Sequence, residues 1–413
     1  MDNKLKTEET LQNTTSPESG KAEQPSVSSG GARQTFTVSN QALNKALKVL
    51  SGVVDHSQVI QILGYLKCSI HNQKLSLIAS NSEIETHISI PVSASEHIQE
   101  QSFTLPCRKL FDITRTVDSD ADLTISPKDS WSEVTVAKTR FKLASLPANS
   151  FPQLTKCAPD RSIRVSQNDL LLLLNRTSFA MASQDVRFFL NGMLISLTKD
   201  KMHAVATDGH RLSLNALDQS GFSDITPVSP EKSDDAVHFI VPRKTIQELR
   251  KHLQETDAPV EIAIGNQHMS VVSDEIAIYS NLIDGKYPNY QKLIPRDFKH
   301  QVVVSTDALR HSISKMAILA NEKFHGARFF FEQDKLTIST HNVNHEEAVD
   351  ELPITLSGEP IRIGFNLMYL VDILSVVATE TIRINMVDIK SSVSFEEVDG
   401  NQDSLFIVMP LSI

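Results

Sequence analysis

The chain has 413 residues, of which 40% are hydrophobic and 22% are charged, and its formal net charge is −10. This composition is ordinary for a globular chain of about three domains, and the acidic balance argues against a protein that grips nucleic acid with its whole surface. No apolar run is long enough to span a membrane, and three cysteines without a paired motif fit neither a disulfide framework nor a zinc site.

The first segment, residues 1–35, differs from everything that follows. It is rich in Ser, Thr, Glu, Gln and Gly and has almost no large apolar residues. Such a segment cannot bury enough surface to offset the entropy lost on ordering. It has no apolar signal core, and its acidic residues argue against a transit peptide. We therefore predict a disordered N-terminal tail over residues 1–35.

A motif then occurs three times, and each copy predicts the end of a strand followed by a helix. The copies are Val38-Ser39-x-x-x-Leu43, Val165-Ser166-x-x-x-Leu170 and Val304-Ser305-x-x-x-Leu309. In each copy the serine is expected to accept a hydrogen bond from an N–H group of the first helical turn. The repeat is far too long for a solenoid module, so each copy should begin a complete small domain.

A second strand-to-helix junction follows in each third, at residues 103–113, 239–249 and 361–374. In the first two, Pro106 and Pro242 stand at the junction, where a missing N–H costs nothing. Alternating segments at 75–79, 83–90, 132–137, 269–272 and 336–340 predict antiparallel strands with one buried face. The predicted fold is α+β, with three similar domains of antiparallel sheet and two helices each. Their expected bounds are 36–158, 159–298 and 299–413.

Five of the six predicted helices carry positive charge on the side away from their apolar stripe; the sixth, near residues 367–377, has no basic residue. The cations in question are Lys45, Lys48, Arg108, Lys109, Arg115, Arg176, Arg243, Lys244, Arg250, Lys251, Arg310 and Lys315. For any single helix an ordinary solvated face is the simpler interpretation. If the domains form an arc with the helices inside, however, the concave wall attracts a phosphate backbone without reading sequence.

Two arcs of this kind that associate head to tail form a closed ring when the rotation per unit sums to a full turn. A ring that never meets DNA is the alternative, and the basic helix faces argue against it.

An enzyme is a further alternative, in which Asp208, His210 and Arg211 provide acid–base catalysis. A sequence of the form Asp-x-His-Arg is too short to be specific, and Asp-Gly is a common turn signal. No nucleophile motif or Gly-rich phosphate loop accompanies it in the sequence. We therefore assign no catalytic residue.

A metal site at His341 and His345 with Glu346 and Glu347 is the last alternative. These residues follow a predicted strand and share no helix face, so a solvated turn is the better interpretation. We expect neither a metal nor a cofactor.

From about Phe36 to Ile413 the chain resembles the β subunit of bacterial DNA polymerase III, the sliding clamp family. The segments that carry the resemblance are 184–193, 206–212, 284–290, 321–324 and 408–411, of which Ala206-Thr207-Asp208-Gly209-His210-Arg211-Leu212 is the most specific. The resemblance implies a head-to-tail homodimeric ring that encircles duplex DNA and tethers the replicative DNA polymerase as a processivity factor. It implies opening by a clamp loader, no catalysis, and a cytoplasmic, nucleoid-associated location.

The resemblance also implies a pocket between the second and third domains, where polymerases, the loader and repair proteins insert a short, partly apolar peptide. The implied lining is Leu190, Thr207, Gly209, His210, Arg211, Leu212, Pro288, Leu293, Ile407, Met409, Pro410 and Leu411. Leu, Met and Pro give an apolar floor, and Thr, His and Arg can orient a peptide at the rim. The implied subunit interface has Lys138 and Phe141 on one side and Ile318 and Leu319 on the other.

The chain also departs from the family pattern. Residues 57–63, with Ser57 and Gln61, stand where the family has an Arg followed by Thr-Leu-Pro-Ile-Leu, which puts one DNA contact in doubt. Ser412 stands where a basic or polar residue is usual, so affinity at the pocket edge is expected to differ. The N-terminal tail is additional.

Overall fold

The computed structural model describes residues 35–54, 60–93, 100–154, 159–224, 236–321, 324–400 and 404–412. Nearly all of the predicted N-terminal tail, residues 1–34, lies outside these ranges, as does Ser57. We keep the three predicted segments as names for the first, second and third domains.

All six predicted helices are present, two in each domain. They are α1 (Asn40–Val53), α2 (Cys107–Arg115), α3 (Gln167–Ser178), α4 (Arg243–His252), α5 (Thr306–Ala317) and α6 (Leu367–Val376). Their apolar stripes are buried as expected; Leu43, Leu47 and Leu50 of α1 have no exposed surface. The predicted α+β fold is confirmed.

The strands run antiparallel throughout the described residues. The first domain has β1 (Phe36–Ser39), β2 (Tyr65–His71), β3 (Lys74–Ser80), β4 (Ile84–Pro91), β5 (Gln101–Pro106), β6 (Asp122–Pro127), β7 (Trp131–Val136) and β8 (Thr139–Ala144). The second has β9 (Arg161–Ser166), β10 (Gly192–Leu197), β11 (Lys201–Thr207), β12 (Arg211–Asp218), β13 (Phe222–Asp224), β14 (Val237–Pro242), β15 (Pro259–Ile264), β16 (His268–Val272) and β17 (Ile276–Asn281). The third has β18 (His300–Ser305), β19 (Gly326–Phe331), β20 (Lys335–His341), β21 (Glu347–Pro353), β22 (Thr355–Ser357), β23 (Ile361–Asn366), β24 (Thr381–Met386), β25 (Val393–Glu397) and β26 (Leu405–Val408).

Two of the four sheets cross from one domain into the next. One has nine strands in the order β13-β9-β15-β16-β17-β4-β3-β2-β5, and the other nine in the order β14-β10-β11-β12-β26-β25-β24-β18-β22. The two junctions are therefore the pairs β17·β4 and β12·β26. The ends of the chain carry four-stranded sheets, β1-β6-β7-β8 and β21-β20-β19-β23.

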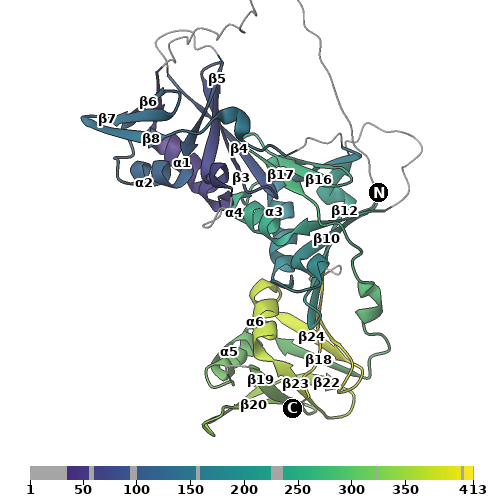
Figure 1. The fold of residues 1–413 in the computed structure, drawn as a ribbon. Helices are drawn as coiled ribbons and strands as arrows, with labels where there is room; N and C mark the ends of the chain where they lie inside the picture. The colour runs from purple at the N-terminus through teal and green to yellow at the C-terminus, as the bar shows by residue number, and fades with distance from the viewer. Residues whose placement is uncertain are drawn as a thin grey trace, which may run out of the picture.

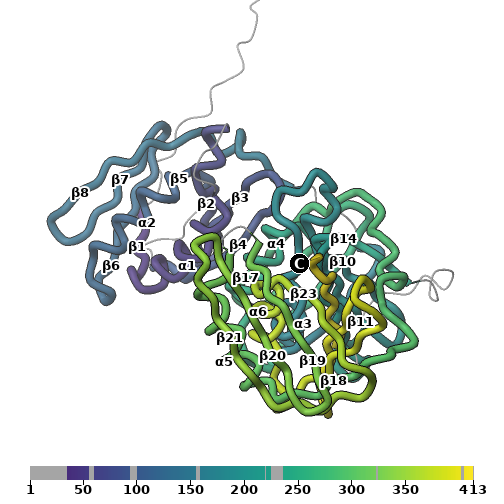
Figure 2. Tube along the Cα trace, turned by 90° about the horizontal axis from the view of Figure 1, so that it is seen from below, coloured from purple at the N-terminus to yellow at the C-terminus, as the bar shows by residue number. Residues whose placement is uncertain are grey.

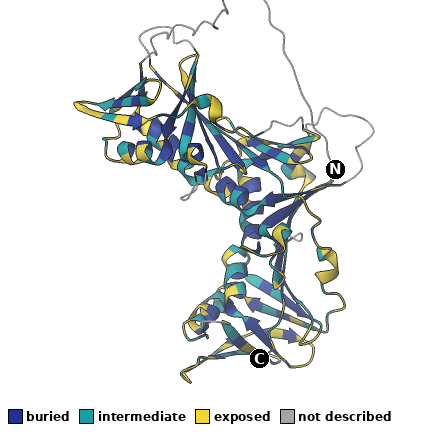
Figure 3. Ribbon diagram, viewed as in Figure 1, coloured by how far each residue is buried: buried dark blue, intermediate teal, exposed yellow. Residues whose placement is uncertain are grey.

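The domains follow one another along an arc (Figure 1). The six helices lie on the concave side of the arc and the sheets form its convex side. Figure 2, turned by 90°, shows β8 at the outer end of the first domain, away from the second. Buried residues follow the contacts between helices and sheets, whereas the β7–β8 end is largely exposed (Figure 3).

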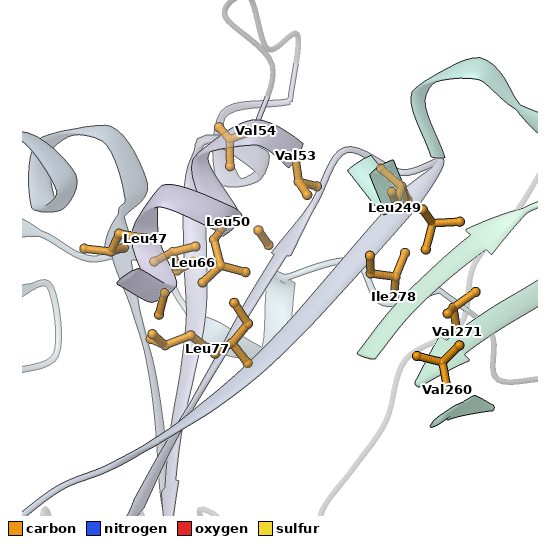
Figure 4. Packing of buried hydrophobic residues seen from close by; sticks show 14 of the residues in the cluster. Leu47, Leu50, Val53, Val54, Leu66, Leu77, Leu249, Val260, Val271 and Ile278 are labelled. Atoms are coloured by element: carbon orange, nitrogen blue, oxygen red, sulfur yellow. The ribbon is translucent and has the colours of Figure 1, made fainter. Parts of the chain in front are cut away.

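The hydrophobic core is continuous across the first junction. Leu47, Leu50 and Leu77 of the first domain belong to the same buried cluster as Leu249 and Ile278 of the second (Figure 4). The third domain has a separate cluster, in which the rings of Phe329 and Phe365 meet edge to face with centroids 5.1 Å apart. The second junction has a smaller buried cluster of its own, to which Leu212 of the second domain and Ile407 of the third belong.

The helix caps match the repeat in two copies out of three. Ser166 accepts from the N–H of Asp169 at 3.0 Å and Ser305 from that of Ala308 at 3.4 Å. The prediction that the Ser39 side chain caps α1 is wrong, because that side chain accepts no hydrogen bond from the first turn of the helix. The buried Asn40 instead donates its side-chain amide to the carbonyls of Thr114, Val117 and Asp118, which ties α1 to the end of α2.

Candidate functional site

The floor of the candidate pocket is an apolar row across five neighbouring strands. It consists of Ile240 in β14, Leu194 in β10, Val205 in β11, Leu212 in β12 and Ile407 in β26, which form one buried cluster. Leu212 is directly opposite Ile407 across the second junction. The two predicted residues thus meet where the second domain joins the third.

The segment that follows β17, residues 282–294, crosses this row. Tyr287 accepts a hydrogen bond from the N–H of Thr207 at 3.1 Å, and burial raises the pKa of its hydroxyl. Tyr290 and Ile294 pack against the apolar row. Leu293, at the end of η5 (Tyr290–Leu293), is 42% exposed, and its carbonyl accepts from the Ser392 hydroxyl of the third domain at 2.9 Å.

The turn at residues 207–211 is shaped by its own side chains. Thr207 Oγ1 accepts from the N–H of Gly209 at 3.0 Å and donates to the carbonyl of Arg211 at 2.6 Å. Asp208 Oδ1 accepts the main-chain N–H groups of His210 and Arg211 at 2.9 and 3.0 Å. Gly209 has φ +90°, a conformation that other residues adopt only at a cost. The geometry of the turn is therefore set by hydrogen bonds within the turn itself.

This geometry gives the acid–base alternative no support. Asp208 contacts the main chain of His210, and the imidazole ring lies instead almost parallel to the ring of Tyr369, with centroids 6.4 Å apart. Among the described residues, no group of three or more His, Cys, Asp or Glu side chains could hold a metal ion.

Arg211 connects the second domain to the third. Its guanidinium donates to Asp208 Oδ2 at 3.1 Å, to the carbonyl of Phe179 at 2.8 Å and to Asp372 in α6. It also lies 4.7 Å from the centroid of the Tyr369 ring, and the side chain is only 12% exposed. These contacts hold the guanidinium in place at the junction, and its role in orienting a peptide at the rim stays a prediction.

The C-terminal segment closes the pocket from the third domain. Met409 donates its N–H to the carbonyl of His210, and Leu411 donates to that of Gly364, both at 2.8 Å. Met409 is 38% exposed, as a contact surface requires. Leu190, in η3 (Phe188–Asn191), is 1% exposed and is therefore buried rather than part of the open surface.

A cavity of about 580 Å³ lies on the β14 side of the crossing segment. Its walls include Leu194, Ile240, Tyr287 and Tyr290, and among the predicted pocket residues only Pro288 lines it. Sequence reasoning missed this half of the row. Every residue of β10 is buried, so alternation gives no signal for which face Leu194 occupies.

The predicted DNA-facing cations divide by exposure. Exposed ones are Lys45, Lys48, Lys109, Arg115, Arg250, Lys251 and Lys315, and half-buried ones are Arg108, Arg243, Lys244 and Arg310. Arg310 donates to the carbonyls of Leu374 and Val377 and so caps the C-terminus of α6. Burial and the nearby charge of Arg243 lower the pKa of Arg250.

The expectation that α3 exposes Arg176 is wrong. Arg176 is 8% exposed, forms an ion pair with Glu397 of β25 and donates to Asn215 at 3.1 Å. Its guanidinium carbon also lies 6.0 Å from the centroid of the Phe406 ring. The last turn of α3 faces the third domain, so this cation joins two domains and is unavailable to a ligand in the central space.

The predicted interface residues lie at the two ends of the arc. Lys138 and Phe141 belong to the β7–β8 hairpin, while Ile318, 78% exposed, and Leu319 follow α5, which packs on β21. Sequence reasoning missed the charges on the two edge strands. Exposed cations on β8 are Arg140 and Lys142, and exposed carboxylates on β21 are Glu347 and Glu351.

Comparison with known proteins identifies the family. Models of the DNA polymerase III beta subunit match the chain as its N-terminal domain at residues 34–155, its central domain at 164–289 and its C-terminal domain at 291–412. The chain belongs to the DNA polymerase III beta subunit family. It is a DNA sliding clamp.

Two curated relatives show how far the similarity extends. This clamp is 36% identical to the beta sliding clamp of Pseudomonas putida KT2440 over 378 residues, which is 92% of this chain and 100% of that relative. The beta sliding clamp of Escherichia coli K12 is 32% identical over the same shares.

Solved structures agree with this assignment. The clamp matches a crystal structure of the Pseudomonas aeruginosa DNA polymerase sliding clamp with ligand at a TM-score of 0.85 and 36% identity, over 92% of this chain and 100% of that one. Another structure of that protein, bound to griselimycin, matches at a TM-score of 0.84 and 35% identity over the same shares. In this clamp, none of the described helices is long and apolar enough to cross a membrane.

Proposed function

We propose that this clamp forms a head-to-tail homodimeric ring around duplex DNA, and the order of its strands is the observation that carries the proposal. In each domain, the third strand after each helix is the junction strand. After the first helix these are β4, β12 and β21; after the second they are β8, β17 and β26. The chain joins β17 to β4 and β26 to β12. Within the described residues, β8 and β21 are the two junction strands that have no partner strand of this kind. Pairing β8 of one subunit with β21 of another would make the remaining junctions of a ring.

The charges of the two strands support this pairing. Arg140 and Lys142 on β8 are opposite in sign to Glu347 and Glu351 on β21. Opposite charges across neighbouring strands stabilise their pairing, and exposed edge strands readily pair with another chain. Phe141 and Ile318 then provide apolar contact beside the new sheet.

The helices on the concave side support a DNA channel. Lys48, Lys109 and Arg115 are exposed on α1 and α2, and these helices lie on the inner side of the arc (Figure 1). Contacts between cations and phosphates carry no sequence information and permit sliding. The clamp in this proposal catalyses no reaction and tethers the replicative DNA polymerase as a cytoplasmic, nucleoid-associated processivity factor.

We further propose that the pocket at the second junction receives short peptides of the polymerase, the clamp loader and repair proteins. The exposed Met409 and Leu293 and the apolar row beneath them support this role. A relative gives further support, since a Caulobacter crescentus clamp structure has PEG bound to a putative beta-motif tethering region. The domain bounds 36–158, 159–298 and 299–413 remain part of the proposal.

The test is retention on DNA of different topology. The clamp is loaded by its cognate loader onto nicked circular DNA and, in parallel, onto linear DNA of the same length. A ring stays on the circle in moderate salt and runs off the linear ends, and cutting the circle should release it. Equal retention on both templates would show binding to the DNA surface and would refute encirclement.

A further inference from the structure

The outer face of the third domain contains a trough that the proposed DNA channel and peptide pocket do not use. It lies on β20, β19 and β23, on the side of the sheet opposite to α5 and the buried Phe329 and Phe331. Phe330 is paired with Thr337 on one side and Arg362 on the other. The trough encloses about 910 Å³.

The floor of the trough is made of small residues. Arg328 is paired with Ser339 on β20 and with Gly364 on β23, so a hydroxyl and a glycine flank it. Ile389, Lys390, Leu411 and Ser412 complete the wall. Gly364 has no side chain, and the main chain of Leu411 bonds to its carbonyl at 2.8 Å. An extended chain therefore finds room between two rows of longer side chains.

The trough is cationic, although the whole chain is acidic. Arg328, Arg362 and Lys390 line it, and none of its described lining residues is acidic. The Arg362 guanidinium lies 4.3 Å from the centroid of the Phe330 ring, which holds it in place.

Two carboxylates close to lining residues in the chain or across the sheet, Asp388 and Glu351, have partners of their own. Asp388 accepts the main-chain N–H groups of Lys390 and Ser391, both at 2.8 Å, and these bonds lower its pKa. Glu351, opposite Thr337 on β21, pairs with Lys335 at 3.0 Å. The cations of the trough are therefore available to an anion from outside.

We propose that this trough binds an acidic, extended segment of the proteins whose peptides occupy the pocket. Arginine forms paired hydrogen bonds to carboxylates, and the volume suits a short peptide. Leu411 belongs both to the trough and to the C-terminal segment that closes the pocket, so one chain can pass from one to the other. The identity of the partner rests on the proposed function; the preference for acidic chains does not.

Single-stranded nucleic acid is the other polyanion that such a surface could attract, and two observations disfavour it. The trough lies on the sheet side of the domain, away from the helices of the concave face. Of its two phenylalanines, Phe329 is buried and Phe330 is already covered by Arg362, so neither ring presents an open face to a base.

The experiment measures binding of a fluorescein-labelled octa-aspartate peptide to the full chain by anisotropy at low salt. Arg328→Glu and Arg362→Glu should each weaken binding by about tenfold or more. Lys74→Glu makes the same charge change on β3 of the first domain and should alter binding by less than about twofold. An equal loss in Lys74→Glu, or no loss in the two trough variants, overturns the proposal.

Two further measurements keep the result specific. Unchanged thermal unfolding of each variant, together with the neutral variant Arg328→Gln, excludes misfolding as the cause of a loss. Competition by oligo-dT at concentrations below those needed for unlabelled octa-aspartate would overturn the proposal in favour of nucleic acid. Met409→Ala should leave octa-aspartate binding intact while it weakens binding of a pocket peptide, so failure of the trough and failure of the pocket are separable.

Discussion

Replacing Arg176 by methionine should destabilise the contact between the second and third domains. Methionine keeps much of the side-chain volume and removes the guanidinium that pairs with Glu397 and bonds to Asn215. The two side chains of the pair are 10% and 1% exposed, so water cannot replace the lost partner of the carboxylate. Within the described part of the chain, the donor that remains to Glu397 is the N–H of Ala378, at 2.9 Å.

The expected magnitude follows from this burial. Breaking a buried ion pair by removing one partner costs about 3–5 kcal/mol, because a charge is left without compensation. Arg164→Met is the matched control, since its pair with Glu261 is 49% and 52% exposed. An exposed pair contributes about 1 kcal/mol or less.

The assay is urea unfolding of the full chain, followed by circular dichroism and by the fluorescence of Trp131, the single tryptophan. Trp131 lies in β7 of the first domain, so its transition should move little while the circular dichroism midpoint falls. The double variant Arg176→Met with Glu397→Gln should recover part of the loss. A cost for Arg176→Met no larger than that for Arg164→Met would refute the reasoning.

Four other predictions concern the proposed ring and its pocket. Ile318→Ala with Leu319→Ala should yield monomers, because it removes apolar surface from both equivalent interfaces; an intact dimer in sedimentation at low concentration would contradict this. Deleting residues 409–413 should abolish pocket-peptide binding and leave the dimer assembled, so unchanged peptide affinity would count against the pocket. Lys48→Glu with Lys109→Glu should reduce the salt dependence of DNA retention by about one unit of slope per lost phosphate contact; Lys251 is a poorer choice, since it also pairs with the buried Glu248. Hydrogen bonding to Arg187 lowers the pKa of Asp185 to about 2, so its stabilising effect should be present above the ordinary value of 3.8 and be lost as the pH falls towards 2. Arg187→Gln should raise the pKa of Asp185 part of the way towards its ordinary value, because the main-chain N–H of residue 187 still donates to the carboxylate. Carboxyl NMR titration measures this pKa, and an unchanged value would exclude the guanidinium as the cause.

The residues that sequence reasoning placed well are those whose neighbours are close in the chain. The helix at Leu43, Leu47 and Leu50 has a local apolar period, and the antiparallel strands have a local alternation. The turn at Asp208 and Gly209 is likewise shaped by side chains within it. Local patterns of this kind also carry the resemblance that identified the family.

Exposure of charged residues could not be predicted in the same way. Arg176 and Arg250 both occur on helices of the second domain with similar local patterns, yet one is buried against Glu397 and the other is exposed. The difference depends on a strand 221 residues further along the chain. Leu194 was missed for a related reason, because all of β10 is buried and has no alternation.

The sequence alone determined three repeats, six helices, the antiparallel strands and the family, since these follow from short-range periodicity and from matching residues. The tertiary structure alone decided which strands join the domains, which arginines connect them and where an anion finds open cations on the outer face. The physical reason is that burial and ion pairing depend on the groups that packing brings together, and those groups are distant in the chain.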